Sequence, residues 1–199
     1  MAPNAVLEAI RKEQIIEAAL ATIAEKGFQN VTLDEVAKAA GMSKGGLVHY
    51  FPTKDTLFRE SVVVFFAGIF ERGRRTRDEV DDPLEQLLSF TWLYDPDDRD
   101  LATGYRLFFD FAALASQDPV FRRLYHEWVE NWIALLVESL AEGNRRGSFR
   151  VADPPAMART ISAIYQGIAE RWYLDREGHT AAWAVDSLRR SVAALLAAI

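Results

Sequence analysis

Apolar residues recur at helical spacing along almost the whole of this 199-residue chain. Ile16, Ala19, Leu20 and Ile23, for example, stand at positions i, i+3, i+4 and i+7, which places them on one face of a helix. No stretch alternates apolar and polar residues for long enough to predict a half-buried strand. The pattern therefore predicts an all-α protein of about nine helices.

The signals for the first two helix ends are specific. Gly27 is expected to end the first helix, because glycine readily adopts the left-handed conformation found after a helix. Thr32 and Glu35 have the spacing of a capping box, in which each side chain satisfies a backbone N–H of the first helical turn. A short second helix therefore begins after Thr32, and Gly41 ends it.

A third short helix is predicted after a tight Gly-x-Ser turn. Ser43 is suited to cap it, and Pro52 closes it, because the residue before a proline is pushed out of the helical region. Thr53 is suited to cap a fourth helix. Two short helices over residues 33–40 and 44–51 have the spacing of a helix-turn-helix. On spacing alone, a purely structural helical hairpin is an equally good interpretation.

A cluster of charges marks a candidate domain boundary. The segment 72–82 holds four arginines followed by four acidic residues. We interpret the arginines as residues that complement the negative end of the fourth helix, in preference to DNA contacts. The expected organisation is an N-terminal domain over residues 1–54, a connecting helix over 54–76 and a second domain over 77–199.

The second domain is predicted to be an antiparallel arrangement of helices. Pro83, Pro119 and Pro154 each suit the first position of a helix, where the missing N–H costs nothing. The helix that begins at Pro83 is expected to reach Trp92. The helix that begins at Pro119 is expected to end at Gly143.

Composition excludes several classes of protein. The formal charge of −6 argues against a protein that coats nucleic acid by bulk electrostatics, but not against specific binding through a small patch. The chain has no cysteine, which excludes disulfides and thiolate metal sites. It shows neither a signal peptide nor a run of about 18 apolar residues. We therefore expect a cytoplasmic protein without a membrane partner.

Sequence motifs for catalysis or metal binding are incomplete. The segment 126–130 has Glu where the helix motif of zinc proteases needs its second His. The segment after Asp95 begins like a calcium loop, but it lacks the glycine and carries Arg106 in place of the final Glu. Neither a phosphate-binding loop nor a nucleophile elbow is present. We expect no catalytic residue, metal or cofactor.

The residues from Gly27 to Leu57 are more informative about function than the spacing of the two short helices. They read GFQNVTLDEVAKAAGMSKGGLVHYFPTKDTL. This run closely resembles the DNA-binding signature of the TetR family of transcriptional regulators, and the resemblance extends from Arg11 to about Leu57. It implies a helix-turn-helix in a homodimer, whose two third helices enter successive major grooves of a palindromic operator in double-stranded DNA.

The resemblance also implies which residues contact DNA. The expected phosphate contacts are Thr32, Ser43, Tyr50 and Lys54. The expected groove-facing residues are Lys44, Gly45, Gly46 and His49. Many family members carry a tyrosine after the leucine of the third helix, where this chain has Val48. The usual phosphate contact is missing there, and Val48 is expected to contact a thymine methyl group instead.

The family resemblance implies that the last two helices form a four-helix bundle with those of a second subunit. Both helices, which Gly178 separates, carry apolar stripes at the end of the chain, where a monomer has little left to cover them. Core packing within one subunit explains part of each stripe. The predicted interface residues are Ile161, Ile164, Tyr165, Ile168, Trp172, Val185, Leu188, Val192 and Leu195.

An effector pocket is predicted where aromatic residues crowd the middle of the chain. Its candidate residues are Trp92, Tyr105, Phe108, Phe109, Asp110, Tyr125, Trp128, Trp132 and Tyr165. Asp110, with the ring of Tyr125 or Trp128, has the chemistry to hold a cation. A solvent-exposed Asp110 and aromatic residues that simply form the core are the alternative interpretation.

These features predict a repressor that leaves its operator when a small, largely apolar or aromatic molecule binds the C-terminal domain. Helix four is the expected connection between the pocket and the helix-turn-helix. The alternative is a constitutive or partner-controlled regulator, a repressor or an activator, that has no small-molecule inducer.

Overall fold

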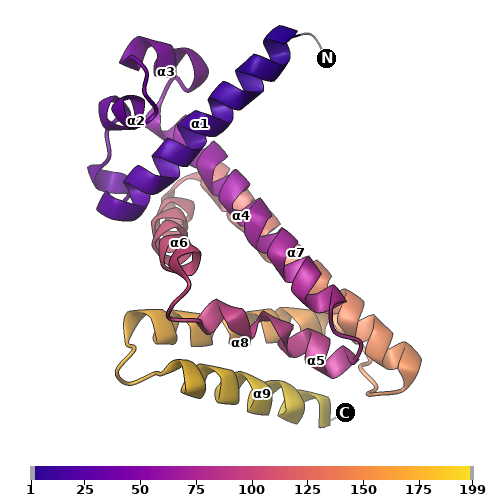
Figure 1. The fold of residues 1–199 in the computed structure, drawn as a ribbon. Helices are drawn as coiled ribbons and strands as arrows, with labels where there is room; N and C mark the ends of the chain where they lie inside the picture. Colours follow the sequence, from indigo (N-terminus) through magenta and orange to yellow (C-terminus); the bar gives the residue numbers. More distant parts are fainter. Residues whose placement is uncertain (1–2, 198–199) are drawn as a thin grey trace. The chain divides into compact units, whose positions relative to one another are not determined.

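The computed structural model describes residues 3–197, and every regular element in this range is helical (Figure 1). The all-α prediction is thus confirmed, and these residues contain nine α-helices and two short 3-10 helices. The elements are α1 (Pro3–Lys26), η1 (Phe28–Asn30), α2 (Leu33–Ala39), α3 (Lys44–Tyr50), α4 (Lys54–Asp78), α5 (Pro83–Leu88), η2 (Ser89–Tyr94), α6 (Arg99–Gln117), α7 (Pro119–Arg146), α8 (Pro154–Leu174) and α9 (Ala181–Ala197). No helix within this range combines the length and apolar composition needed to cross a bilayer.

The chain divides into two compact units. Unit 1 comprises Met1–Ala67 and Ala102–Tyr125, and unit 2 comprises Gly68–Leu101 and His126–Ile199. The helices α4, α6 and α7 each run through both units. The sequence predicts that residues 77–199 form the C-terminal domain, whereas most of α6 and the start of α7 belong with the N-terminal helices.

Aromatic rings fill the core of unit 1. The rings of Phe28 and Phe58 stack with centroids 4.2 Å apart, and the centroid of Phe58 lies 6.0 Å from that of Phe121. Phe111 lies 6.4 Å from Phe121, and all four side chains are buried. Because these residues come from η1, α4, α7 and α6, their packing joins α6 and α7 to the N-terminal helices.

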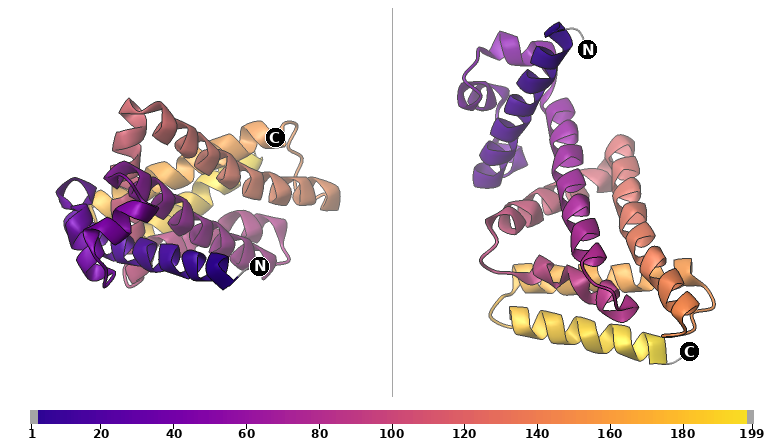
Figure 2. Two further views of the ribbon diagram at one scale, coloured as in Figure 1. Left: turned by 90° about the horizontal axis from the view of Figure 1, so that it is seen from above. Right: turned by 45° about the vertical axis from the view of Figure 1, so that its right-hand side comes forward.

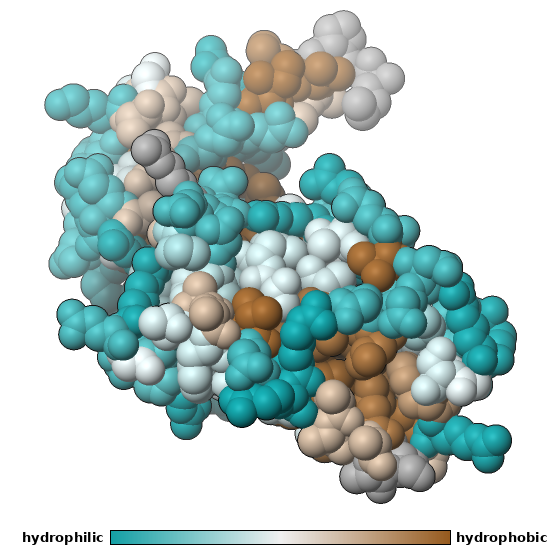
Figure 3. All heavy atoms as spheres, turned by 60° about the horizontal axis from the view of Figure 1, so that its bottom comes forward, coloured by the Kyte–Doolittle hydropathy of each residue, from teal (hydrophilic) through white to brown (hydrophobic). Residues whose placement is uncertain are grey.

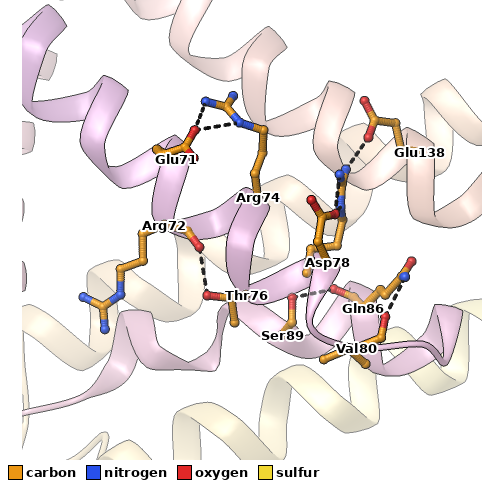
Figure 4. A network of polar contacts seen from close by, with 10 residues as sticks. Glu71, Arg72, Arg74, Thr76, Asp78, Val80, Gln86, Ser89 and Glu138 are labelled. Carbon is orange, nitrogen blue, oxygen red and sulfur yellow. Dashed lines mark hydrogen bonds and ion pairs between the residues drawn. The ribbon is translucent and has the colours of Figure 1, made fainter.

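A network of polar contacts holds the end of α4 in unit 2 (Figure 4). Gln86 of α5 donates a hydrogen bond from Nε2 to the carbonyl oxygen of Val80 at 2.8 Å. Arg77 pairs with Glu138 of α7. The helix α4 reaches Asp78, two residues beyond the expected end. The segment 72–82, predicted as a boundary, is therefore helical up to Asp78, and only residues 79–82 form a turn before α5.

The helix predicted from Pro83 to Trp92 is interrupted. The helix α5 ends at Leu88 and the tighter 3-10 helix η2 follows, so the prediction of one continuous α-helix is wrong. The Ser89 hydroxyl donates to the carbonyl oxygen of Gln86 at 2.8 Å. A serine hydroxyl at this point competes with the backbone ladder of a helix, which favours a break.

The helix α7 does not end at Gly143, as the sequence suggested. It continues to Arg146, and Gly147, with φ of 75°, ends it. Gly143 is instead a packing position, because a Cβ there would lie only 2.0 Å from Cζ of Phe149. The prediction was wrong because a glycine that makes room for a ring is indistinguishable in sequence from one that ends a helix.

The helices α8 and α9 lie side by side as an antiparallel hairpin in unit 2 (Figure 2). Tyr165 of α8 is buried and donates its hydroxyl hydrogen to the carbonyl oxygen of Leu87 at 2.8 Å. Burial raises the pKa of Tyr165 above its ordinary value, so its hydroxyl stays neutral and remains a donor. Tyr94 of η2 donates to the carbonyl oxygen of Tyr165 at 3.3 Å. These bonds join the hairpin to α5 and η2.

The residues predicted for a subunit interface fall into two groups. Six are buried within the single chain, namely Ile161, Tyr165, Ile168, Trp172, Leu188 and Val192. The hairpin covers them by packing on η2 and α5, so they are core residues of the protomer. Of the predicted set, Ile164, Val185 and Leu195 are half-exposed and offer surface to a second subunit. Figure 3 shows that apolar side chains also gather on part of the molecular surface.

Candidate nucleic-acid interface

Local hydrogen bonds explain the start of α2. Thr32 accepts a hydrogen bond from the backbone N–H of Glu35, and Glu35 accepts one from the backbone N–H of Thr32, which completes the predicted capping box. Lys26, at the end of α1, donates to Glu35 at 2.6 Å. The bond from Lys26, followed by those from the backbone and side chain of Thr32, lowers the pKa of Glu35 to about 2.

The turn between α2 and α3 follows from a left-handed residue. Gly41 has φ of 67°, a conformation that residues with a Cβ adopt only at a cost. The N–H of Met42 then returns to the carbonyl oxygen of Ala37 at 2.9 Å. Val36 and Leu47, one from each helix, are buried, so the two helices pack as the sequence predicted. The prediction of a helix-turn-helix geometry is thereby confirmed.

The exposed side of α3 is the central feature of this unit. Leu47 and the residue that follows the helix, Phe51, are buried. On the other side Lys44, Gly45, Val48 and His49 are exposed. They form two adjacent i, i+4 pairs and so make one continuous strip along the helix. We call these four residues the α3 strip.

Two members of the α3 strip are unusual for a solvated surface. Val48 is 36% exposed although it is apolar. A Cβ built on Gly45 would meet no atom within 4 Å, so folding does not require a glycine there. Exposed helical positions ordinarily favour polar residues with high helix propensity. An apolar side chain and a bare backbone suit a surface that another molecule approaches closely.

Lys44 already has an acidic partner within the protein. Its Nζ lies 2.6 Å from Oδ2 of Asp34 in α2, and both side chains are more than half exposed. A pair in that position is screened by water and easily exchanged. Phosphate oxygens can therefore replace Asp34 as the partner of Lys44.

The other predicted phosphate contacts differ in the contacts that they already make within the protein. Ser43 caps α3 by accepting from the N–H of Gly46 at 3.1 Å, which leaves its hydroxyl hydrogen available as a donor. Tyr50 is half-exposed, and its ring lies edge-on to that of His49 at 5.3 Å. Lys54 instead donates to the carbonyl oxygen of Gln29 at 3.0 Å.

Lys54 therefore has a structural role that sequence reasoning missed. Its Nζ lies 4.4 Å from the centroid of the Phe28 ring, and its side chain joins the start of α4 to η1. Such a cation–π contact, with a hydrogen bond to a carbonyl oxygen, restrains the ammonium group. The motif that suggested a phosphate contact gives no signal for this second role.

The helix α6 is fastened to the segment before α2 by two side chains one turn apart. Arg106 donates to the carbonyl oxygens of Ala24 and Glu25, at the end of α1. Asp110 accepts the N–H of Phe28, at the start of η1, with a distance of 2.8 Å. A cation thus faces carbonyl groups and an anion faces an N–H group, which are favourable arrangements at helix ends. We call this pair of residues the α6 clamp.

The α6 clamp changes the interpretation of Asp110. The sequence predicts either a cation ligand or a solvated side chain at Asp110, and neither alternative includes a bond to the backbone 82 residues earlier. A single sequence contains no pattern that predicts a contact between residues so far apart.

The nine predicted pocket residues are divided between the two units. Tyr105, Phe108, Phe109, Asp110 and Tyr125 belong to unit 1, whereas Trp92, Trp128, Trp132 and Tyr165 belong to unit 2. In unit 1 the ring of Phe108 lies 6.2 Å from that of Tyr125. In unit 2 the ring of Trp132 lies 5.3 Å from that of Phe90, which in turn lies 5.8 Å from Tyr165. The pocket itself stays a prediction.

A hollow of about 260 Å³ lies in unit 2 at the turn after α7. Asn144, Arg150, Val151 and Ala152 line it. None of these is a predicted pocket residue. Within the described part of the chain, no group of three or more His, Cys, Asp or Glu side chains is placed to hold a metal ion.

Comparison with known proteins matches both parts of the chain to family models. Residues 15–61 match the model for bacterial regulatory proteins of the tetR family. Residues 83–197 match the model for the C-terminal part of BetI-type transcriptional repressors.

Individual relatives agree with these matches. The regulator BetI of Burkholderia thailandensis is 30% identical over 171 residues, with 83% of each chain covered. BetI of Stenotrophomonas maltophilia is 33% identical over 123 residues, which is 61% of this chain and 63% of that protein. Among solved structures, a transcriptional regulator of Saccharomonospora viridis in complex with choline has a TM-score of 0.80 and 22% identity, with 95% of this chain and 96% of that chain covered.

The helix-turn-helix geometry and these relatives define a DNA-binding transcriptional regulator. The chain belongs to the TetR family, and its C-terminal part is of the BetI type. The resemblance seen in the sequence is thereby confirmed.

Proposed function

We propose that this protein is a homodimeric repressor that binds a palindromic operator through α3 and is released when a small molecule binds its C-terminal part. The α3 strip carries the proposal. The fold explains neither the exposed apolar side chain of Val48 nor the glycine at position 45. A repressor acts on the chromosome, so the proposal places the protein in the cytoplasm.

We assign the DNA contacts by chemistry. The ammonium group of Lys44 and the hydroxyl groups of Ser43 and Tyr50 suit phosphate oxygens. Val48 and His49 suit base edges in the major groove, the valine through a thymine methyl group and the imidazole through a hydrogen bond.

A dimer with two α3 helices about 34–36 Å apart would read two half-sites on one side of the duplex. In this proposal α8 and α9 hold the two subunits together, and their half-exposed residues Ile164, Val185 and Leu195 form part of the contact.

The effector is proposed to be a small organic molecule. Two observations support this proposal, namely the BetI-type match of the C-terminal part and the choline bound to the similar regulator of Saccharomonospora viridis. Release follows if the effector binds better to a conformation whose α3 helices are misplaced for DNA, because affinity for DNA then falls by the difference in binding free energy.

A gel-shift titration with the DNA upstream of the protein's own coding region tests the proposal. Saturable binding to a short palindrome is expected, and Lys44→Ala should weaken it. Loss of one phosphate contact should also reduce the slope of log K against log salt by roughly 0.9. Arg190→Ala is the matched control, because Arg190 is an exposed cation on α9 that pairs with Asp186 and lies outside the helix-turn-helix.

The outcomes are distinct. Equal losses for Lys44→Ala and Arg190→Ala would contradict binding through α3. Specific binding that no small molecule reduces, with choline as the first one tested, would favour a regulator without an inducer. If a selection from genomic fragments also yields no bound DNA, the DNA-binding proposal fails.

A further inference from the structure

Unit 2 contains a cation held between an aromatic ring and a carboxylate. The guanidinium carbon of Arg72, in α4, lies 4.0 Å from the centroid of the Trp92 ring in η2. Nη1 of Arg72 lies 2.5 Å from Oδ2 of Asp98, the residue before α6. An aromatic face and a carboxylate are the two groups by which proteins recognise organic cations.

The carboxylate of Asp98 is held in place independently of Arg72. Its Oδ1 accepts the backbone N–H groups of Asp100 at 3.0 Å and Leu101 at 3.2 Å, so Asp98 caps the first turn of α6. Only 15% of its side chain is exposed. Burial opposes its ionisation, but the bond from Arg72 and those from the two N–H groups outweigh burial, and the pKa of Asp98 lies below its ordinary value. The negative charge therefore persists at neutral pH.

The Trp92 side of the arrangement is incomplete. The indole Nε1 is buried and has no hydrogen-bond partner among the described residues. Buried donors without a partner are uncommon in folded proteins and call for an explanation. A second occupant that carries an oxygen acceptor beside its cationic group, as choline does in its hydroxyl group, would satisfy this N–H.

The guanidinium group that occupies this arrangement is partly exposed to solvent. The side chain of Arg72 is 36% exposed, so its guanidinium group can move into water without crossing the protein. Arg77, one turn and a half later in α4, provides the contrast, because its side chain is only 12% exposed and pairs with both Asp78 and Glu138. In Figure 4 the Arg72 side chain extends away from the other labelled side chains.

We propose that Trp92 and Asp98 form a binding site for a small organic ammonium ion, which the chain fills with its own Arg72 until the effector displaces it. The inference rests on the proposed function, since it gives the effector a chemical class and a place. A quaternary or tertiary ammonium group fits, because it needs a ring face and a negative charge but few hydrogen-bond acceptors.

Displacement of Arg72 has a consequence for the DNA-binding unit. Arg72 and Asp98 connect α4 to the start of α6, and both helices continue into unit 1. There α6 carries the α6 clamp, which fastens it to α1 and η1. An ammonium ion that replaces Arg72 satisfies Asp98 but leaves α4 unconnected to α6 at this point, so the restraint on both helices changes.

Calorimetric titration of the full chain with choline and tetramethylammonium tests the site. Arg72→Ala removes the internal competitor and should tighten binding of either cation about tenfold, as expected when the competent state becomes fully populated. Asp98→Asn keeps a good helix cap but removes the charge, and should weaken binding about tenfold or more. Arg74→Ala, which removes another exposed arginine of α4, should bind like the parent protein.

A neutral ligand tests whether binding needs the charge. A DNA-release measurement distinguishes failure of this site from failure of the proposed function. 3,3-Dimethylbutan-1-ol, which has the shape of choline without its charge, should not bind. The inference is overturned if Arg72→Ala binds no cation, or if neither Arg72→Ala nor Asp98→Asn changes the affinity. If choline releases DNA from the parent and from Asp98→Asn at equal concentrations, the proposed function stands and this site fails. If the protein binds no DNA at all, the proposed function fails, whatever the titrations show.

Discussion

Gly45 lies in the first turn of α3, at a position where the fold leaves room for a side chain. The backbone of Gly45 is helical and open, and a Cβ there would touch nothing within 4 Å. Glycine in a helix costs about 0.5–1 kcal/mol relative to alanine. The chain thus carries a residue that weakens α3 and that the fold does not need.

Gly45→Ala should therefore raise the free energy of unfolding by about 0.5–1 kcal/mol, measured by urea denaturation. Gly45→Leu should fold equally well but lose affinity for DNA at least tenfold, because the larger side chain holds the backbone away from the groove. Gly41→Ala is the control for stability, since at φ of 67° a Cβ costs about 1–2 kcal/mol. Undiminished DNA binding by Gly45→Leu would show that Gly45 does not face the duplex.

The lowered pKa of Glu35 predicts how the stability of the protein changes in acid. Its pKa is lowered from 4.5 to about 2 in the folded protein, first by the bond from Lys26 and then by those from Thr32. A carboxylate with a depressed pKa contributes stability that is complete above its unfolded pKa and disappears as the pH falls through its folded pKa. The contribution of Glu35 is therefore lost between pH 4.5 and about 2.

Glu35→Gln keeps a capping-box residue at this position but cannot ionise. The thermal midpoint of this variant should fall less steeply than that of the parent between pH 4.5 and 2.5. Glu60→Gln removes a charge elsewhere in unit 1 and should follow the parent curve. Parallel curves of thermal midpoint against pH for the parent and Glu35→Gln would show that Glu35 does not contribute to the loss of stability in acid.

At the scale of elements, the α6 clamp decides how α6 is connected to the DNA-binding helices. Asp110→Ala leaves the part-buried N–H of Phe28 without its acceptor, which should cost about 1–3 kcal/mol in urea denaturation. Asp110→Asn retains a carbonyl oxygen at the same place and should lose less. Ser116→Ala, an exposed substitution near the end of α6, is the control.

The same substitutions test the path of regulation. If α6 carries the response, Asp110→Ala should bind DNA but require more effector for release than Ser116→Ala, in the same gel shift. An unchanged effector concentration would show that the response reaches α3 without the α6 clamp.

A charge on α9 tests the subunit contact of the proposed dimer. Val185→Glu places a charge on a half-exposed position of α9. It should yield monomers in sedimentation experiments and weaken operator binding about a hundredfold or more, because a monomer reads only one half-site. The control is Val63→Glu, the same substitution at an exposed valine of α4, which should remain dimeric. A dimeric Val185→Glu protein would place the interface elsewhere.

Local chemistry determined much of this protein. The capping box at Thr32, the left-handed Gly41, the Ser43 cap and the prolines at helix starts were all predictable, because each acts within a few residues along the chain. The resemblance of residues 27–57 to a known signature extended this local pattern to a function, and the family match confirmed it.

Long-range contacts could be decided only by the tertiary structure. Such contacts include the hydrogen bond that Asp110 accepts from Phe28 of η1 and the ion pair of Arg72 with Asp98. The burial of six expected interface residues likewise joins segments that sequence patterns treat separately. A helical period predicts that one face of a helix is apolar, but not which surface covers that face. The reason is that the hydrophobic effect is non-directional and does not select a particular partner. Local sequence patterns thus predicted most of the helices and the helix-turn-helix, whereas tertiary packing decided which surface covers each apolar face and which group each charge contacts.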